Sequence, residues 1–119
     1  MWFVLFKTLE GVPYYGDEPD VPEPLPDPRV EIYNFDIGKE YLGYFEQDFI
    51  NPVDERLNAL MDDYTDVDYL NTEKCIKLEF WLKERLTRDL PEALKPIYEK
   101  LLEYASHAVE LKTGVIVQL

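Results

Sequence analysis

Six of the nine prolines in the chain fall between residues 8 and 28, which limits what this segment can become. From residue 22 to residue 28, proline alternates with other residues. Proline cannot donate to a strand ladder or sit inside a helix, so the segment is predicted to be an extended or polyproline loop. A loop of this length is usually functional, and the alternative is an ordered wrap along a sheet edge.

The rest of the sequence predicts an α+β fold, in which a small, mostly antiparallel sheet packs against about three helices. Runs of β-branched and aromatic residues indicate the strands, and apolar residues at helical spacing indicate the helices. The predicted strands are 2–7, 29–37 and 115–119, and the predicted helices lie near 52–64, 72–87 and 95–111.

Several boundaries follow from local signals. Asn51-Pro52 is a typical helix start, with Asn51 as the N-cap. Residues 40–45 are predicted to form a hairpin with the 29–37 strand, and 72–87 is compatible with helix or strand, with helix favoured by its composition. Gly114 is predicted to take the left-handed position that ends the last helix.

Length and composition point to a single domain over residues 1–119 with an acidic, proline-rich loop at 8–28. The chain is 46% hydrophobic, which is sufficient for a core. The apolar run at 1–7 is too short for a secretory signal, and no other apolar stretch approaches the ~20 residues that cross a bilayer. Cys75 is the only cysteine, so no internal disulfide can form, and we expect a cytoplasmic protein.

The net charge of −13 is distributed unequally along the chain. Residues 1–28 contain one basic and six acidic residues, and residues 29–70 contain three basic and eleven acidic residues. Residues 71–119 contain eight of each sign, so the whole excess lies before residue 71. Such a charge opposes binding to nucleic acid and to anionic membranes and favours a basic protein partner, although acidity also serves solubility.

The predicted partner-binding residues are the acids of the most negative segments and one tyrosine. The acids clustered at the carboxyl end of the 52–64 helix are included because negative charge is unfavourable at a helix carboxyl end unless it has a use. Tyrosine beside an exposed polar segment is typical of interface hot spots. The predicted set is Asp62, Asp63, Asp66, Asp68, Glu46, Asp48, Tyr15, Asp17 and Glu18.

The sequence contains no pattern typical of catalysis, and no catalytic residue or cofactor is predicted. There is a single histidine, His107, no second cysteine for a zinc site and no glycine-rich phosphate loop. The acids at 63–68 raise the possibility of calcium. An EF-hand loop starting at Asp66 would need glycine and glutamate where the chain has Asn71 and Lys77.

The segment from Leu101 to Leu119, a helix running through Thr113-Gly114 into an apolar strand, resembles the ends of some bacterial immunity proteins of contact-dependent growth inhibition and related polymorphic toxin systems. The resemblance implies a cytoplasmic inhibitor that binds one cognate toxin domain, often a basic nuclease. We therefore expect an immunity protein that neutralises a basic toxin domain and is not an enzyme. The alternatives are a DNA-mimic inhibitor of a nuclease or restriction system, of phage type, and a calcium-binding module. The oligomeric state is left open.

Overall fold

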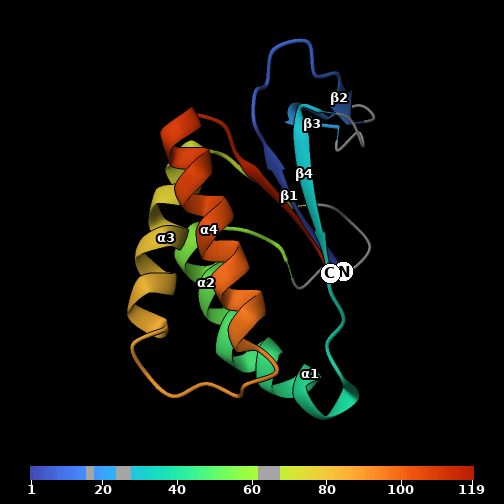
Figure 1. Ribbon diagram of the computed structural model, residues 1–119. Coiled ribbons are helices and arrows are strands. Elements are labelled where there is room, and N and C mark those ends of the chain that lie inside the picture. Colours follow the sequence, from blue (N-terminus) through green and yellow to red (C-terminus); the bar gives the residue numbers. More distant parts are fainter. Residues whose placement is uncertain (16–17, 24–27, 62–67) are drawn as a thin grey trace.

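Strand β1 (Trp2–Phe6) lies inside a four-stranded sheet in the computed structural model, which describes residues 1–15, 18–23, 28–61 and 68–119 (Figure 1). β1 pairs on one side with β4 (Val30–Asn34) and on the other with β6 (Val115–Gln118). β5 (Asp68–Leu70) pairs with the outer edge of β6. All of these pairings are antiparallel, so the predicted α+β class and its antiparallel sheet are confirmed, and β5 is an additional strand.

The unbroken apolar run of β1 reflects burial on both faces of the sheet, because successive side chains of a strand point to opposite sides. Phe3 and Leu5 face the helices and belong to the main core. Val4 and Phe6 face the other way and form a smaller buried cluster with Val30 and Ile116. All four β1 side chains named here are at most 1% exposed.

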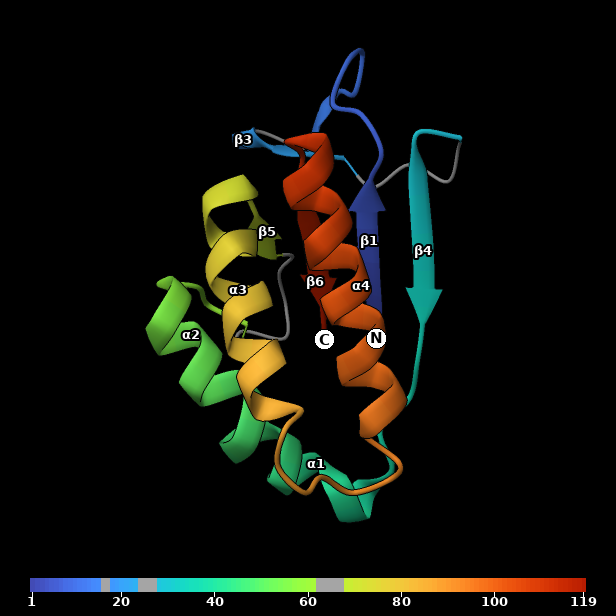
Figure 2. The same cartoon turned by 60° about the vertical axis from the view of Figure 1, so that its left-hand side comes forward.

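Three helices cover one face of the sheet: α2 (Asn51–Leu57), α3 (Thr72–Arg85) and α4 (Lys95–Leu111) (Figures 1 and 2). Figure 2 shows α3 between α2 and α4. The ambiguous segment 72–87 is therefore a helix, and Asn71 caps it by accepting a hydrogen bond from the backbone N–H of Lys74. Within the described ranges, no helix is long and apolar enough to cross a membrane.

The predicted hairpin at 40–45 is wrong, since this segment is helix α1 (Lys39–Phe45). It continues through one π-helical stretch, η1 (Glu46–Ile50), directly into α2, so Asn51 lies within a continuous helical path and is not an N-cap. Phe45 stacks on Phe49 at 4.9 Å between ring centroids, and tertiary packing of this kind overrides strand propensity. Pro52 lacks the N–H that would continue the ladder, and the wider π turn before it keeps the chain helical.

Helix α2 ends at Leu57, earlier than the predicted residue 64, because Asn58 adopts a left-handed conformation with φ 54°. The Asp54 side chain then accepts a hydrogen bond from the backbone N–H of Met61 at 2.7 Å. The chain therefore leaves the helical direction, and Leu60, which continues the helical spacing of the buried Val53 and Leu57, is 69% exposed.

The last helix begins at Lys95 as predicted, with Pro96 in its first turn, but its carboxyl end differs from the prediction. Lys112, not Gly114, takes the left-handed position, with φ 56°. Gly114 is needed for close packing instead, since a Cβ there would lie 2.5 Å from the Leu70 carbonyl oxygen and from the Tyr69 ring. The Thr113 hydroxyl donates to the Phe6 carbonyl and so joins the end of α4 to β1.

The proline-rich segment 8–28 contains regular structure that the sequence did not predict. β2 (Tyr14–Tyr15) and β3 (Glu18–Pro22) form a separate two-stranded antiparallel sheet with a register shift between Tyr14 and Tyr15. Two strands of this length tolerate proline because their outer edges need no ladder donors. In Figure 1 this small sheet lies at the end of the molecule opposite α1.

Gly114→Ala is expected to destabilise the protein by about 1–3 kcal/mol, because the new methyl group would meet backbone and a packed ring. Gly43→Ala is the matched control. It lies in α1 with no atom within 4 Å of the added Cβ, so it should stabilise the helix by about 0.5–1 kcal/mol. Urea unfolding of both variants measures this difference, and equal midpoints would contradict the packing role of Gly114.

Candidate partner-binding site

The predicted partner-binding residues lie in separate parts of the molecule. Tyr15 and Glu18 belong to β2 and β3, whereas Glu46 and Asp48 belong to η1 beside α1, at the opposite end (Figure 1). Asp68 begins β5, at the edge of the main sheet. These residues lie at the two ends and at one sheet edge of a molecule 40 Å long, so they do not form one patch. Four further predicted residues, Asp17, Asp62, Asp63 and Asp66, lie outside the described residues.

Asp48 is engaged inside the protein. Its carboxylate accepts hydrogen bonds from Arg85 Nε at 3.0 and 3.1 Å and from the Tyr98 hydroxyl at 2.7 Å. Arg85 also donates through Nη2 to the Tyr44 hydroxyl at 2.9 Å. The Arg85 side chain is only 6% exposed and that of Asp48 is 22% exposed. Asp48 therefore joins η1 to α3 and α4, a structural role that the sequence did not predict.

The charges of this cluster stabilise one another. Burial, with the neighbouring Asp48 carboxylate, raises the pKa of Tyr98 above its usual value, so the phenol stays a donor. Burial would lower the pKa of Arg85, but the hydrogen bond and charge of Asp48 outweigh it and the pKa is raised. The spacing Cys75, Leu78, Leu82, Arg85 was the available sequence signal, because it places an arginine on the buried stripe of α3, where a charge needs a partner.

Asp68 and Glu46 have different surroundings. The Asp68 carboxylate accepts a hydrogen bond from the backbone N–H of Leu60 at 3.1 Å, so it also helps to hold the backbone. Glu46 is exposed on η1, and Glu40 is exposed on the adjoining α1. Lys39 lies on the same short helix, so this end of the molecule carries mixed charge.

The most uniformly acidic described region is the acidic ribbon, which we define as the turn at residues 9–12 with β2, β3 and Glu23. No lysine or arginine occurs between residues 8 and 28, and this segment includes six acids. Tyr14 is 63% exposed on β2, and Glu10 is also exposed. The predicted set includes Tyr15, Asp17 and Glu18 of the segment 8–28 but not its other acids and tyrosine, Glu10, Asp20, Glu23 and Tyr14.

A glycine turn and an arginine anchor this ribbon. Gly11 has φ 74° at the third position of the turn in which the N–H of Val12 donates to the Leu9 carbonyl at 3.2 Å. Glycine takes this conformation without strain. Arg29, the first base after the segment, donates through Nη1 to the Gly11 carbonyl at 2.7 Å. The ribbon is therefore tied to the start of β4 through its backbone.

The β strands of the ribbon are held mainly by each other. Their principal contacts are mutual, and the backbone N–H of Glu23 donates to the Pro13 carbonyl at 2.8 Å. Val12 packs against the smaller buried cluster on the outer face of the main sheet. The ribbon is thus attached through its base and lies beyond the end of β1 (Figure 1).

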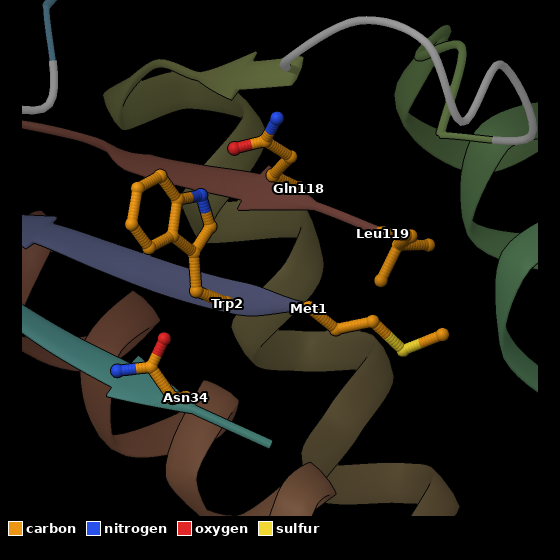
Figure 3. Close-up of a pocket in the computed structure, with 5 residues that line it drawn as sticks. All are labelled: Met1, Trp2, Asn34, Gln118 and Leu119. Carbon is orange, nitrogen blue, oxygen red and sulfur yellow. The ribbon is translucent and has the colours of Figure 1, made fainter. Parts of the chain in front are cut away.

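The hollow at one end of the sheet is lined by no ionisable side chain. This hollow of about 290 Å³ is lined by Met1, Trp2, Asn34, Gln118 and Leu119, with the side chains of Trp2, Asn34 and Gln118 on the same side (Figure 3). These side chains include no acid, histidine or cysteine. Among the described residues, no group of three histidine, cysteine or acidic side chains could hold a metal ion. Residues 63–67 of the segment considered for calcium lie outside the described residues.

Comparisons of the chain with protein-family models, curated proteins and solved structures found no match. The function is therefore inferred from the geometry and charge of the chain itself.

Asp48→Ala is expected to destabilise the protein by about 3–5 kcal/mol, because it leaves the buried Arg85 charge without its partner. Glu31→Ala is the matched control. Its carboxylate pairs with Lys7 at 3.7 Å on the surface, and such a pair contributes only about 0–1 kcal/mol. Equal losses in urea unfolding would contradict the structural role of Asp48.

Cys75 is expected to resist thiol reagents in the folded protein. The side chain is fully buried, its Sγ donates to the Leu70 carbonyl, and burial raises its pKa to about 12. The reaction with Ellman's reagent should be slow in buffer and complete in denaturing urea. Because the unfolded thiol ionises near pH 8.5, this group should also reduce stability as the pH rises from about 9 to about 12. Rapid stoichiometric reaction of the folded protein would contradict this burial.

Proposed function

We propose that the chain is a cytoplasmic immunity protein that binds and neutralises a cognate basic toxin domain, a nuclease, through the acidic ribbon. The observation that carries this proposal is the ribbon itself, an acidic segment free of basic residues, with Tyr14 63% exposed on it. The resemblance of the segment from Leu101 to Leu119 to immunity proteins adds support from a separate part of the chain.

The charge gives the ribbon a physical means of finding such a partner. A nuclease must attract phosphates, so its substrate cleft is positive, and acids on an inhibitor are drawn to the same field. Steering of this kind raises association rates by about 10 to 1,000-fold and weakens with salt. Inhibition then needs only occupancy of the cleft and no chemistry by the inhibitor.

Tyr14 supplies the second component of binding. Tyrosine buries a large, rigid ring at a small entropic cost and is enriched among residues that dominate binding energy. An exposed tyrosine on a segment rich in acids therefore suits a basic surface that also has an apolar hollow. The acids would set the association rate, and the ring would slow dissociation.

The direct test is copurification with the product of the gene immediately upstream, followed by a nuclease assay at a one-to-one ratio. Binding and inhibition would support the proposal, and an upstream gene without a toxin-like product would overturn it. If the chain instead inhibits a restriction enzyme or another DNA-binding nuclease of unrelated origin, the DNA-mimic alternative replaces it.

Charge reversal locates the contact. Glu10→Lys with Glu23→Lys in the ribbon should slow association with the toxin about tenfold or more at low salt and reduce its salt dependence. Glu92→Lys with Glu99→Lys, beside and in the first turns of α4, changes the net charge equally and should alter the rate less than about twofold if the ribbon alone steers binding. Stopped-flow or surface-plasmon measurements give both rates, and a larger effect of the α4 pair would overturn the assignment to the ribbon.

Tyr14→Ala should act on the dissociation rate, with a loss of about 2 kcal/mol in binding if the ring is a central anchor. Leu42→Ala, which truncates a 37% exposed apolar residue on α1 at the other end of the molecule, is the control for loss of an exposed apolar side chain. Unchanged dissociation for Tyr14→Ala would remove the ring from the interface.

A further inference from the structure

The outer face of α3 carries two large apolar side chains that nothing in the described chain covers. Ile76 is 52% exposed and Phe80 is 67% exposed, one helical turn apart. The opposite face of α3, with Cys75, Leu78 and Leu82, is fully buried. Because α3 is flanked by α2 and α4, its outer face lies on the solvent side of the helical layer (Figure 2).

This face differs in charge from the rest of the molecule. Residues 71–119 carry no net charge, whereas the excess of −13 lies before residue 71. Two copies of the chain repel each other least where the local charge is balanced. The exposed apolar pair lies in this balanced part.

The exposed face is also complementary to itself. Glu73, Ile76, Phe80 and Lys83 follow at steps of three, four and three, which keeps them on one side of the helix. The spacing of these four residues is the same in both directions along the helix. An acid stands at one end of the set and a base at the other. In an antiparallel pair of α3 helices, Ile76 of one copy therefore lies opposite Phe80 of the other, and Glu73 lies opposite Lys83.

We propose that two copies of this chain associate through the outer faces of α3, antiparallel, about a two-fold axis that crosses this face midway between Ile76 and Phe80. A two-fold interface uses the same patch on both copies, and this requires the self-complementary order just described. Lys83 is available for such a contact because its side chain is 63% exposed, although it lies 3.3 Å from Glu79 of its own helix. The proposal does not depend on the toxin-binding function, because the acidic ribbon is a separate surface.

Sedimentation velocity of the full chain tests the association itself. The mass should rise from 14.1 kDa toward twice that value between about 10 µM and about 1 mM, the range in which small interfaces associate. A constant monomer mass over this range would overturn the proposal.

Phe80→Glu tests the location. It should weaken association at least tenfold without loss of stability, because the ring is mostly exposed. Leu111→Glu, which places the same charge on a 47% exposed apolar residue at the end of α4, should leave association within about twofold of the unchanged protein. An undiminished dimer in Phe80→Glu would overturn the α3 interface.

A charge exchange tests the antiparallel register. Glu73→Lys and Lys83→Glu should each weaken association several-fold, because each replaces two attractive pairs by two repulsive ones across the axis. The double variant, Glu73→Lys with Lys83→Glu, restores opposite charges and should recover the original association constant within about twofold. A double variant as weak as the single ones would overturn this register.

Discussion

Much of the helical layer is organised around the buried side chain of Arg85. A guanidinium on the core side of α3 requires a carboxylate, and Asp48 of η1 supplies it together with a hydrogen bond from the Tyr98 hydroxyl of α4. Three segments distant in sequence are thereby fixed to one another. The π turn before Pro52 belongs to the same arrangement, because it brings Asp48 toward α3 while Phe45, Phe49 and Ile50 stay in the core.

The sheet is built around a different constraint, the burial of β1 on both faces. Its helical side joins the main core and its other side joins Val30 and Ile116. The Thr113 hydroxyl and the close approach at Gly114 then align β6 with β1 and β5. The acidic ribbon lies at one end of the molecule and α1 lies at the other (Figure 1). Separation of scaffold from surface in this way suits a protein that acts by binding.

The predicted contact acids have different roles in the structure because their surroundings differ. An acid can be exposed, can bond to the backbone or can pair with a buried base, and the sequence does not distinguish these cases. Glu46 is of the first kind, Asp68 is of the second and Asp48 is of the third. The density of acids in the segment 8–28 was visible in the sequence, but its folding into a two-stranded ribbon anchored by Arg29 was not.

The sequence by itself determined the elements whose signals are local: the apolar strand at 2–7, the helix at 95–111, the closing strand and the α+β class. It also determined that the excess negative charge precedes residue 71. The tertiary structure alone decided that 39–45 is helical, that α2 ends at Leu57 and that Asp48 forms an internal ion pair with Arg85. These outcomes depend on contacts between residues far apart in the chain, such as the 37 positions between Asp48 and Arg85, and local spacing carries no record of such contacts.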